Sequence, residues 1–332
     1  MSTVADSGPQ QTATPGSFVP DTDGGHRPVL LHPLIDSLQP RPGQVVVDGT
    51  LGAGGVTAAL LERVRPGGRV IAVDRDPEAA ARGRARFAGE PVTVVHDDVA
   101  NLDRIIADLG IDSVDAVALD LGISSVQLDD PRRGFSFRHD GPLDMRLDQP
   151  GGGLTAADVV NTYPESELVD LIRSYGEERF ARGIAAAIVR RRGERRLAST
   201  RELAELVERA VPRRYWPKHI HPATRTFQAL RIEVNGELAS LERALQAAIT
   251  ALRPGGRLGV IAFHSLEDIL VKNALNVAAQ NCLCPPQQPL CTCAHRASLF
   301  LLTRKAIKAG PAELAVNPRA RSARLRVAEK LA

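Results

Sequence analysis

Three acidic residues, Asp48, Asp74 and Asp120, each end a short apolar run, and the glycine-rich segment DGTLGAGG at 48–55 follows the first run. Glycines let a backbone pass close to a ligand without interference from Cβ atoms, and a helix that starts there points its amide N–H groups at the same place. In parallel α/β sheets, ligands bind beyond the carboxyl ends of the strands. The pattern therefore predicts a nucleoside- or nucleotide-binding site at the ends of three strands.

The glycine spacing favours a ligand without phosphates over a dinucleotide. Gly52 and Gly54 match the first two positions of the dinucleotide fingerprint G-x-G-x-x-G, but Thr57 occupies the third. A carboxylate at Asp48 would also repel a pyrophosphate, whereas it suits a ligand that carries an ammonium group. S-adenosylmethionine has an α-amino group, a sulfonium and no phosphate, so we expect it to be the cofactor, and an NAD-dependent oxidoreductase is disfavoured.

Two further acidic positions are candidates for contacts with the nucleoside. Asp74 is placed to accept hydrogen bonds from both ribose hydroxyls, and the alternative is that it caps the helix expected from Pro77. Asp97 and Asp98, with Val99 beside them, follow the third predicted strand, where such folds contact the adenine. The alternative for either of these two residues is an exposed loop acid.

The elements that must position these residues alternate between strand and helix. Apolar runs at 44–47, 69–73, 92–95 and 114–119 predict strands. The pattern through Ala58, Leu60 and Leu61 and the patterns at 77–87 and 101–109 predict helices. Such alternation implies a parallel, doubly wound α/β sheet with right-handed crossovers. Arg-Pro-Gly-Gly at 65–68 and again at 253–256 is interpreted as a helix-to-strand turn that is used twice.

The alternation stops after the fourth predicted strand. Residues 129–150 are rich in Gly, Arg, Asp and Pro and predict a loop, whereas the patterns at 154–210 are helical. A helix at 237–252 then leads to a fifth strand-like run at 257–263. A sheet that is interrupted near residue 125 and resumes near 257 predicts an inserted helical subdomain.

The chain divides into four predicted parts: a disordered tail at 1–25, the first part of the core at 26–130, an inserted loop and helical subdomain at 131–220, and the second part of the core at 221–332, with a cysteine-containing loop at 280–295 and a basic C-terminal segment. The tail is rich in Ser, Thr, Gly and Pro and lacks the basic start and apolar stretch of a secretory signal. No run approaches the roughly 18 apolar residues of a membrane helix. We expect a cytoplasmic protein with no membrane partner.

Ten motifs, in order from His26 to Lys330, resemble the bacterial 16S ribosomal RNA cytosine-N4 methyltransferases, the MraW or RsmH family. They are HRPVLL at 26–31, DGTLGAGG at 48–55, AVDRDP at 72–77, LDLGISS at 119–125 with Gln127, RGFSF at 133–137, GPLDMR at 141–146, YGEER at 175–179, HPATRTFQALR at 221–231, FHSLED at 263–268 and NPRARSARLR at 317–326. The resemblance implies a class I methyltransferase core with an inserted helical subdomain. It also implies methylation of the exocyclic amine of one cytosine in the decoding centre of the small ribosomal subunit.

The resemblance also implies which residues meet the cofactor. The family's cofactor positions correspond here to Gly54, Gly55, Val56, Asp74, Asp120 and Gln127, with Asp98 or Val99 near the adenine. To these the residue pattern adds Asp48 and Gly52. The chain departs from the family at Val56, where histidine is common, so any role of an imidazole there is absent. The implied partner is 16S rRNA within the small subunit, and a homodimer is left open.

The reaction itself is expected around the loop from Asp120 to Ser125. Asp120 would contact the cofactor amine or, as the second choice, accept the proton of the cytosine amine, and the third interpretation is a structural strand-end carboxylate. Ser124 and Ser125 lie in the same loop. The Asp/Asn-Pro-Pro-aromatic motif that many amino-methyltransferases carry is missing, which disfavours a DNA amino-methyltransferase. A ribosome factor that binds RNA without a cofactor remains an alternative.

His264 follows the fifth predicted strand and has two interpretations. It either forms the wall of the pocket that receives a cytosine extracted from its stack, or it belongs to a helix-capping turn in which Ser265 is the N-cap and Glu267 lies in the first turn.

Basic residues gather in the stretches 179–201, 213–231 and 319–330, although the net charge is only +3. The alternative to RNA binding is a solvated helix face for each stretch, but three such stretches favour a phosphate-rich partner. The candidate phosphate contacts are Arg133, Arg138, Arg225, Arg231, Arg319, Arg321 and Arg324. Phe135, Phe137 and Phe227 are candidate stacking surfaces or, alternatively, core residues.

The chain has four cysteines: Cys282, Cys284, Cys291 and Cys293. Their two C-x-C pairs could bind a tetrahedral zinc ion, although the spacing is tighter than the usual C-x2-C. The alternative is four reduced thiols in a proline-rich loop, in keeping with a cytosolic protein. Methyl transfer requires no metal.

Overall fold

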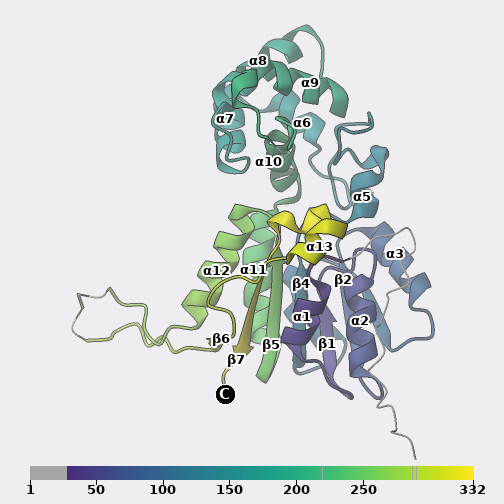
Figure 1. Ribbon diagram of the computed structural model, residues 1–332, viewed down its shortest axis with the longest axis vertical. Helices are drawn as coiled ribbons and strands as arrows, with labels where there is room; N and C mark the ends of the chain where they lie inside the picture. The colour runs from purple at the N-terminus through teal and green to yellow at the C-terminus, as the bar shows by residue number, and fades with distance from the viewer. Residues whose placement is uncertain (1–27, 219, 286, 289) are drawn as a thin grey trace, which may run out of the picture.

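The computed structural model describes residues 28–218, 220–285, 287–288 and 290–332. Within these residues seven strands form one sheet in the order β3-β2-β1-β4-β5-β7-β6 (Figure 1). The strands are β1 (Val45–Asp48), β2 (Arg69–Asp74), β3 (Val92–His96), β4 (Val114–Asp120), β5 (Leu252–Ala262), β6 (Leu299–Leu301) and β7 (Arg324–Lys330). Strands β1 to β5 run parallel, and β7 pairs antiparallel with both β5 and β6. The predicted disordered tail at 1–25 lies outside the described residues.

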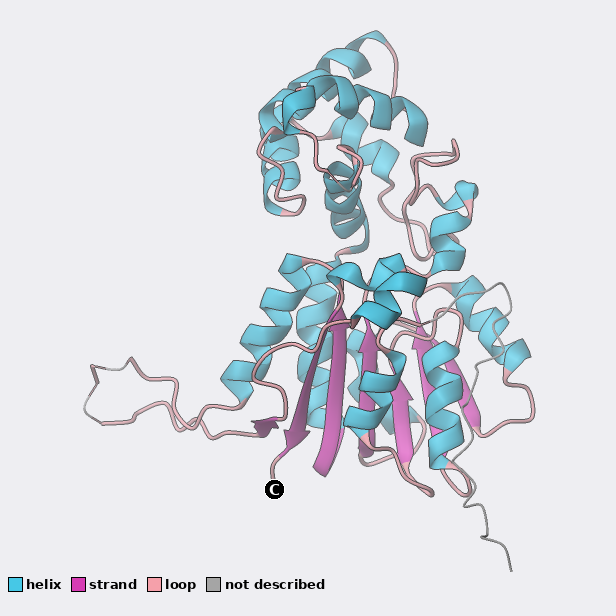
Figure 2. Ribbon diagram, viewed as in Figure 1, coloured by secondary structure: helices cyan, strands magenta, loops and turns pink. Residues whose placement is uncertain are grey.

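Helices cover both faces of the sheet, so its central strands are buried on both sides (Figure 2). The helices α1 (Leu31–Leu38) and α2 (Gly55–Val64) pack on one face, and α4 (Leu102–Asp108), α11 (Glu237–Ala251) and α12 (Ser265–Ala278) pack on the other. In β1, Val46 enters the first of these cores and Val47 the second. Burial on both faces explains why the strands are continuous apolar runs.

The chain order creates a crevice at the carboxyl edge of the sheet. From β1 the chain moves outward to β2, through α3 (Pro77–Arg86), to β3, and then returns to the other side of β1 to form β4. The connections that leave β1 and β4 therefore diverge, and such a switch point is where doubly wound folds bind ligands.

The helical subdomain stands over this carboxyl edge (Figure 1). It contains α6 (Ala156–Thr162), α7 (Glu165–Ser174), α8 (Ala181–Glu194), α9 (Thr200–Ala210) and α10 (Thr224–Asn235), which share a hydrophobic core of their own. The predicted boundary at 220 is wrong, because α10 contributes Phe227 and Leu230 to that core. Phe135 is buried in the same core and Phe137 packs against it, so these aromatic side chains serve packing within the subdomain.

Asn235, at the end of α10, ties the subdomain to the sheet. Its Oδ1 accepts a hydrogen bond from the backbone N–H of Leu147 at 2.8 Å, and its Nδ2 donates to the carbonyl of Met145 at 2.8 Å. Its own carbonyl accepts from Arg75, which follows β2, at 2.9 Å. The two chain crossings between core and subdomain are thus joined at one buried side chain. No helix in the described part of the chain is long and apolar enough to cross a membrane.

The second Arg-Pro-Gly-Gly segment, 253–256, is part of β5 and does not form the predicted turn. Val114 pairs with Leu252 and Ala116 with Arg257, so the segment bulges opposite the single residue Asp115. The short helices α5 (Ser125–Asp129) and α13 (Pro311–Val316) and the edge strands β6 and β7 were not predicted. The helices α5 and α13 and the strand β6 have too few residues to show a periodic pattern. Strand β7 does show one, because its charged residues alternate with apolar ones.

Candidate active site

A cavity of about 210 Å³ lies at the carboxyl ends of β1, β2 and β4. We call it the central cavity. Most of the predicted cofactor and catalytic residues line it, namely Gly52, Gly55, Val56, Asp74, Asp98, Val99, Asp120, Ser124, Ser125 and Gln127. The predicted phosphate contact Arg319 also lines it. Helix α11 adds a wall that was not predicted, through Glu237, Ser240, Leu241 and Ala244.

Asp48 does not line the central cavity, and its predicted contact with the cofactor is wrong. Its side chain is 0% exposed, and its Oδ2 accepts a hydrogen bond from Thr57 Oγ1 at 2.6 Å. Its Oδ1 accepts from the backbone N–H of Thr50 at 3.1 Å. Burial raises the pKa of this carboxyl group to about 6. Thr57, the residue that breaks the dinucleotide fingerprint, is therefore the partner that holds Asp48 beneath the glycine turn.

Gly54 shapes the turn from outside the cavity. Its φ is +81°, and a Cβ atom there would lie 2.9 Å from the ring of Phe87. Its backbone N–H donates to the carbonyl of Leu51 at 2.6 Å. Gly52, in contrast, lines the cavity with φ +51°, and a Cβ atom on it would stand 3.6 Å from Ser124. Only a residue without a side chain leaves this space free for a ligand.

Asp74 faces the cavity with its carboxylate fixed by the backbone. Its Oδ2 accepts from the N–H of Gly52 at 2.7 Å and its Oδ1 from the N–H of Asp76 at 2.8 Å. The helix cap that was the alternative role belongs to Asp76, whose Oδ1 accepts from the N–H of Glu78 at 2.9 Å. Burial raises the pKa of Asp74. Each carboxylate oxygen keeps a lone pair for a further donor.

Arg133 is a buried structural residue, so its predicted contact with RNA is wrong. It is only 3% exposed, and its guanidinium donates to Asp76 Oδ2 at 2.7 Å and to the carbonyl of Leu147 at 2.8 Å. Gln127 Nε2 donates to the same Asp76 oxygen at 2.7 Å, while its Oε1 accepts from the N–H of Ser124. Because both polar ends of Gln127 are engaged, it positions the loop at the cavity wall.

Asp98 also has partners within the chain. Its carboxylate accepts from Ser240 Oγ of α11 at 2.8 and 2.7 Å, and its Oδ1 accepts from the N–H of Ala100 at 2.9 Å. It lines the cavity beside Val99, so it is not the exposed loop acid that was the alternative. Ser240 was missed because nothing in the sequence indicates that α11 packs against the turn after β3.

Asp120 differs from the other carboxylates, because none of the described residues donates a hydrogen bond to its Oδ1, which is shielded from solvent. Its backbone N–H donates to Thr50 Oγ1 at 2.7 Å, which places the residue at the cavity floor. Burial and the nearby charges of Asp48 and Glu267 raise the pKa of Asp120 to about 8. The site thus holds an unpartnered acidic oxygen that a positive charge or an N–H donor would satisfy.

His264 is the N-cap of α12, not Ser265 as the capping interpretation proposed. Its Nδ1 accepts from the N–H of Glu267 at 3.4 Å, and Glu267 Oε2 accepts from the N–H of Phe263 at 2.8 Å. Glu267 lines the central cavity, whereas His264 does not. Burial of Glu267 favours its neutral form, but the hydrogen bond and charge of His264 and the charge of Arg231 outweigh burial and lower its pKa.

Arg231 is a second predicted RNA contact that the structure corrects. Its guanidinium makes two hydrogen bonds of 2.8 Å with the carboxylate of Glu237, across the junction of α10 and α11. It is therefore engaged inside the protein. Glu237, six positions after Arg231, is the acidic partner that the sequence offers. The pair was not predicted because the two residues lie on different helices, joined at Gly236, so helical spacing does not bring them together.

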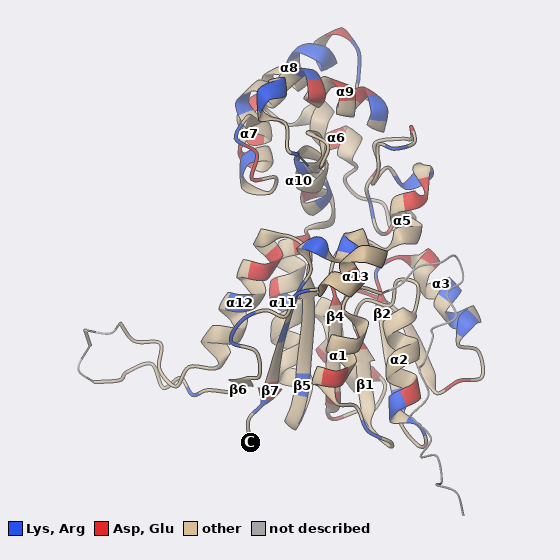
Figure 3. Cartoon of the chain, in the orientation of Figure 1, with Lys and Arg blue, Asp and Glu red and all other residues tan. Residues whose placement is uncertain are grey.

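A second hollow adjoins the central cavity and shares Phe263 with it. It is lined by His264 and by four basic residues: Arg225, Lys308, Arg321 and Arg324. We call it the basic hollow. Lys and Arg positions of the chain also lie next to α13, at the end of the sheet that faces the subdomain (Figure 3). Of the predicted phosphate contacts, Arg138 is outside both hollows.

The sequence of the chain matches a known family. The family model described as the MraW methylase family covers residues 23–331. The chain belongs to the MraW methylase family. It is similar to a protein of Syntrophotalea carbinolica named ribosomal RNA small subunit methyltransferase H, at 50% identity over 92% of this chain and 98% of that relative. A protein of the same name from Geobacter sulfurreducens is 50% identical over 92% of this chain and 99% of its own length.

Among solved structures, the fold is similar to that of TrmN from Thermus thermophilus, with a TM-score of 0.43, 15% identity, and coverage of 93% of this chain and 50% of that one. The chain is therefore an S-adenosylmethionine-dependent methyltransferase, and its fold is the class I α/β fold. The family match confirms the predicted family, methyltransferase activity and cofactor, and the strand order confirms the predicted fold class.

Proposed function

We propose that this MraW methylase transfers a methyl group to the exocyclic N4 of a cytosine in the decoding centre of 16S rRNA. The names of the relatives support the small ribosomal subunit as substrate. The observation that carries the proposed chemistry is the unpartnered Oδ1 of Asp120 at the floor of the central cavity. The finer assignment, one cytosine and its N4, rests on the sequence motifs.

The central cavity has the groups that the methyl donor requires. When bound, S-adenosylmethionine supplies an electrophilic methyl group on a sulfonium. We place the ribose at Asp74, because its carboxylate is oriented by two backbone N–H groups and still has lone pairs to accept hydroxyl hydrogens. The open face of Gly52 leaves room for the rest of the donor. The turn at Val99 borders the position proposed for the adenine.

Asp120 is the proposed acceptor of the amine proton. The lone pair of a cytosine amine is conjugated with the ring, so positive charge grows on that nitrogen as its bond to the methyl carbon forms. A carboxylate oxygen beside the nitrogen stabilises this charge and takes the proton. Contact with the amino group of the donor is the second role proposed for Asp120. Ser124 and Ser125 then act by shaping the loop, since Ser124 caps α5 and Ser125 Oγ accepts from Arg319.

The basic hollow is the proposed path of the RNA backbone. Arg225, Arg321 and Arg324 lie beside the cavity mouth, where phosphates that flank an extracted base would pass. Arg324 also makes an ion pair with Asp268 at 2.7 Å, so it contributes less free charge than Arg321. A cytoplasmic location belongs to this proposal, because ribosomal subunits are the substrate. The homodimer considered from the sequence stays a prediction.

Modification mapping of 16S rRNA tests the proposal. Deletion of the gene should remove one N4-methyl group from a decoding-centre cytosine, and mass spectrometry of rRNA fragments should detect its return with the wild-type gene. Complementation with Asp120→Asn should not restore it, although the variant protein should fold. Retention of the methyl group in the deletion strain would refute the substrate, and methylation by Asp120→Asn at the wild-type rate would refute the role of Asp120.

A further inference from the structure

The four cysteines lie on an arm that projects from the body of the protein. The arm leaves the end of α12 and returns at β6, at the edge of the sheet and away from the helical subdomain (Figure 1). Its base is closed by a hydrogen bond of 2.8 Å from the N–H of Ser298 to the carbonyl of Ala278. Further out, Leu283 is 44% and Leu290 77% exposed. The described residues of the arm therefore include large apolar side chains that no core covers.

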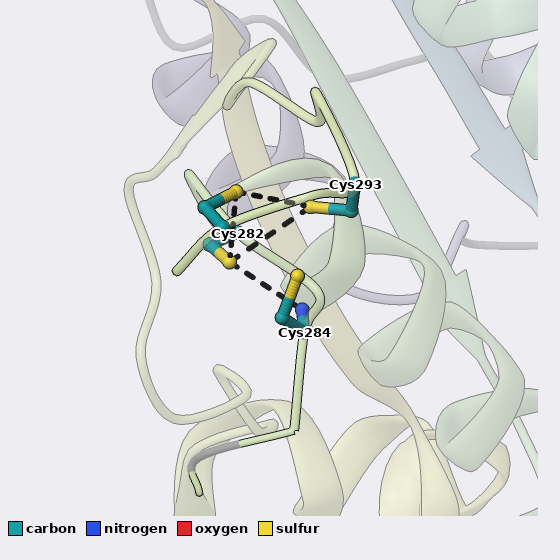
Figure 4. A group of neighbouring side chains, drawn as sticks. Cys282, Cys284 and Cys293 are labelled. Carbon is teal, nitrogen blue, oxygen red and sulfur yellow. Dashed lines mark hydrogen bonds between the residues drawn. The ribbon is translucent and has the colours of Figure 1, made fainter. Parts of the chain in front are cut away.

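In spite of this exposure, the four thiol groups converge. The ligand atoms of Cys282, Cys284, Cys291 and Cys293 all lie within 4.8 Å of one another. Figure 4 shows the sulfurs of Cys282, Cys284 and Cys293 turned toward a common centre. The sulfur of Cys282 lies 3.4 Å from that of Cys291 and 3.8 Å from that of Cys293. Without a hydrophobic core, another interaction must hold the two C-x-C segments together.

These separations match a tetrahedral thiolate site. Four sulfurs that each lie about 2.3 Å from a zinc ion are about 3.8 Å from one another. The sulfurs of Cys291 and Cys293, in one C-x-C segment, are 3.6 Å apart. Because the Cys282 sulfur contacts sulfurs of both these residues, the arrangement singles out no pairing into two disulfides. Carboxylate or water ligands are not needed to complete four-coordination.

The backbone around the sulfurs is arranged to favour thiolates. The N–H of Leu283 points at Cys293 Sγ over 3.3 Å, and the N–H of Thr292 points at Cys284 Sγ over 3.4 Å. Hydrogen bonds from backbone N–H groups are the outer contacts that orient and stabilise metal-bound ligands.

We propose that Cys282, Cys284, Cys291 and Cys293 bind one Zn²⁺ in a closed, structural site of four thiolates that folds the arm. Binding releases the protons of the four thiols. Four protein ligands leave no open coordination position, so the site is structural. No described residue of the arm lines the central cavity, and the arm leaves the sheet away from the helical subdomain (Figure 1), so this site is separate from methyl transfer.

Metal analysis of the untagged, full-length protein, purified without chelators, tests this site. We expect one zinc per chain and little iron by inductively coupled plasma mass spectrometry. The double variant Cys282→Ser/Cys293→Ser should lose the zinc and still bind S-adenosylmethionine. The matched control Thr292→Ala lies between two of the proposed ligands, keeps its backbone N–H, and should retain the zinc.

A second measurement needs no variant. A mercurial thiol reagent should release one zinc from the wild-type chain, detected with a chromogenic chelator, as four thiols react. The arm should then become sensitive to limited proteolysis, while the core stays intact. Iron in place of zinc, four reactive thiols with no metal, two disulfides by mass spectrometry, or full zinc in the double cysteine variant would each overturn the proposal.

Discussion

The two sides of the central cavity hold their acidic groups in different ways. On the side of β1 and β2, Asp74 accepts two backbone hydrogen bonds, and Asp48, which lies beneath the glycine turn and outside the cavity, accepts hydrogen bonds from Thr57 and Thr50. On the side of β4 and β5, Asp120 Oδ1 has no donor among the described residues. The first side is preorganised by the chain itself, whereas the second keeps an acidic oxygen whose partner must come with the substrates. We therefore assign binding of the methyl donor to the side of β1 and β2, and the chemical step to the side of β4 and β5.

Asp120→Asn should have the largest effect on the chemical step. The amide cannot take a proton or balance a positive charge, so we expect kcat to fall about 10²–10⁴-fold while the affinity for S-adenosylmethionine changes much less. Single-turnover methylation of small ribosomal subunits measures the rate, and calorimetry measures the affinity for S-adenosylmethionine. A variant that loses donor affinity but keeps its single-turnover rate would move Asp120 to the donor-binding role.

The donor side should depend on the buried ion pair between Arg133 and Asp76. Arg133→Ala leaves the Asp76 carboxylate buried with a partner missing, so we expect a loss of about 3–5 kcal/mol in the free energy of unfolding. The control Arg132→Ala removes a neighbouring guanidinium whose side chain is 80% exposed, and should leave the free energy of unfolding almost unchanged. Urea denaturation measures both. Equal changes in the free energy of unfolding for the two variants would mean that the ion pair between Arg133 and Asp76 does not stabilise the fold.

Asp74→Ala should weaken S-adenosylmethionine binding by about 10–100-fold, the range for losing hydrogen bonds to a charged group. Asp74→Asn keeps one acceptor oxygen and should fall between that variant and the wild type. Calorimetric titration at pH 7 measures the dissociation constants. If both variants bind as tightly as the wild type, Asp74 does not contact the ribose.

The stability of the acceptor side should depend on pH. The pKa of Asp120 is raised to about 8, so its protonated form is favoured in the folded state, and stability is lost progressively as the pH rises from the usual carboxyl pKa of 3.8 to about 8. Asp120→Asn should therefore have a higher Tm than the wild type at pH 9, with a smaller difference at pH 6. The methylation rate at saturating donor should rise with pH, with a midpoint below 8, because the bound cation favours the carboxylate. A Tm difference that is the same at both pH values would contradict the burial of an unpartnered Asp120.

The smallest effect is expected at the mouth of the cavity. Arg321→Ala in the basic hollow should raise KM for the ribosomal subunit a few-fold, leave kcat unchanged, and reduce the salt slope of binding by about 1. The control Arg63→Ala lies in the last turn of α2, with a side chain that is 52% exposed, and should change neither. Filter binding over a salt series provides the comparison, and equal slopes for both variants would remove Arg321 from the RNA path.

The sequence predicted the parallel strands and the acids at their ends, because a strand buried on both faces is a continuous apolar run and its polar end stands out. It failed where a side chain is defined by a distant partner. Arg133 is buried because of Asp76, which lies on the other side of the interruption in the sheet. The basic character of a residue says nothing about such a partner.

Two segments with the same four-residue sequence also have different structures. Arg-Pro-Gly-Gly at 65–68 leaves α2 in a turn, whereas the same residues at 253–256 bulge within β5 opposite Asp115. Arg253 forms an ion pair with Asp115 across the strands, whereas Arg65 pairs with Glu90 in the loop before β3. Tertiary pairing thus overrides local turn preference at the second of these segments.

The most direct test is a calorimetric titration of the wild-type protein with S-adenosylmethionine and, separately, with NAD⁺. One molecule of S-adenosylmethionine should bind per chain and NAD⁺ should give no binding heat, because the turn above Asp48 has no site for a pyrophosphate. Absence of S-adenosylmethionine binding, or binding of NAD⁺ with equal affinity, would contradict the assignment of the central cavity.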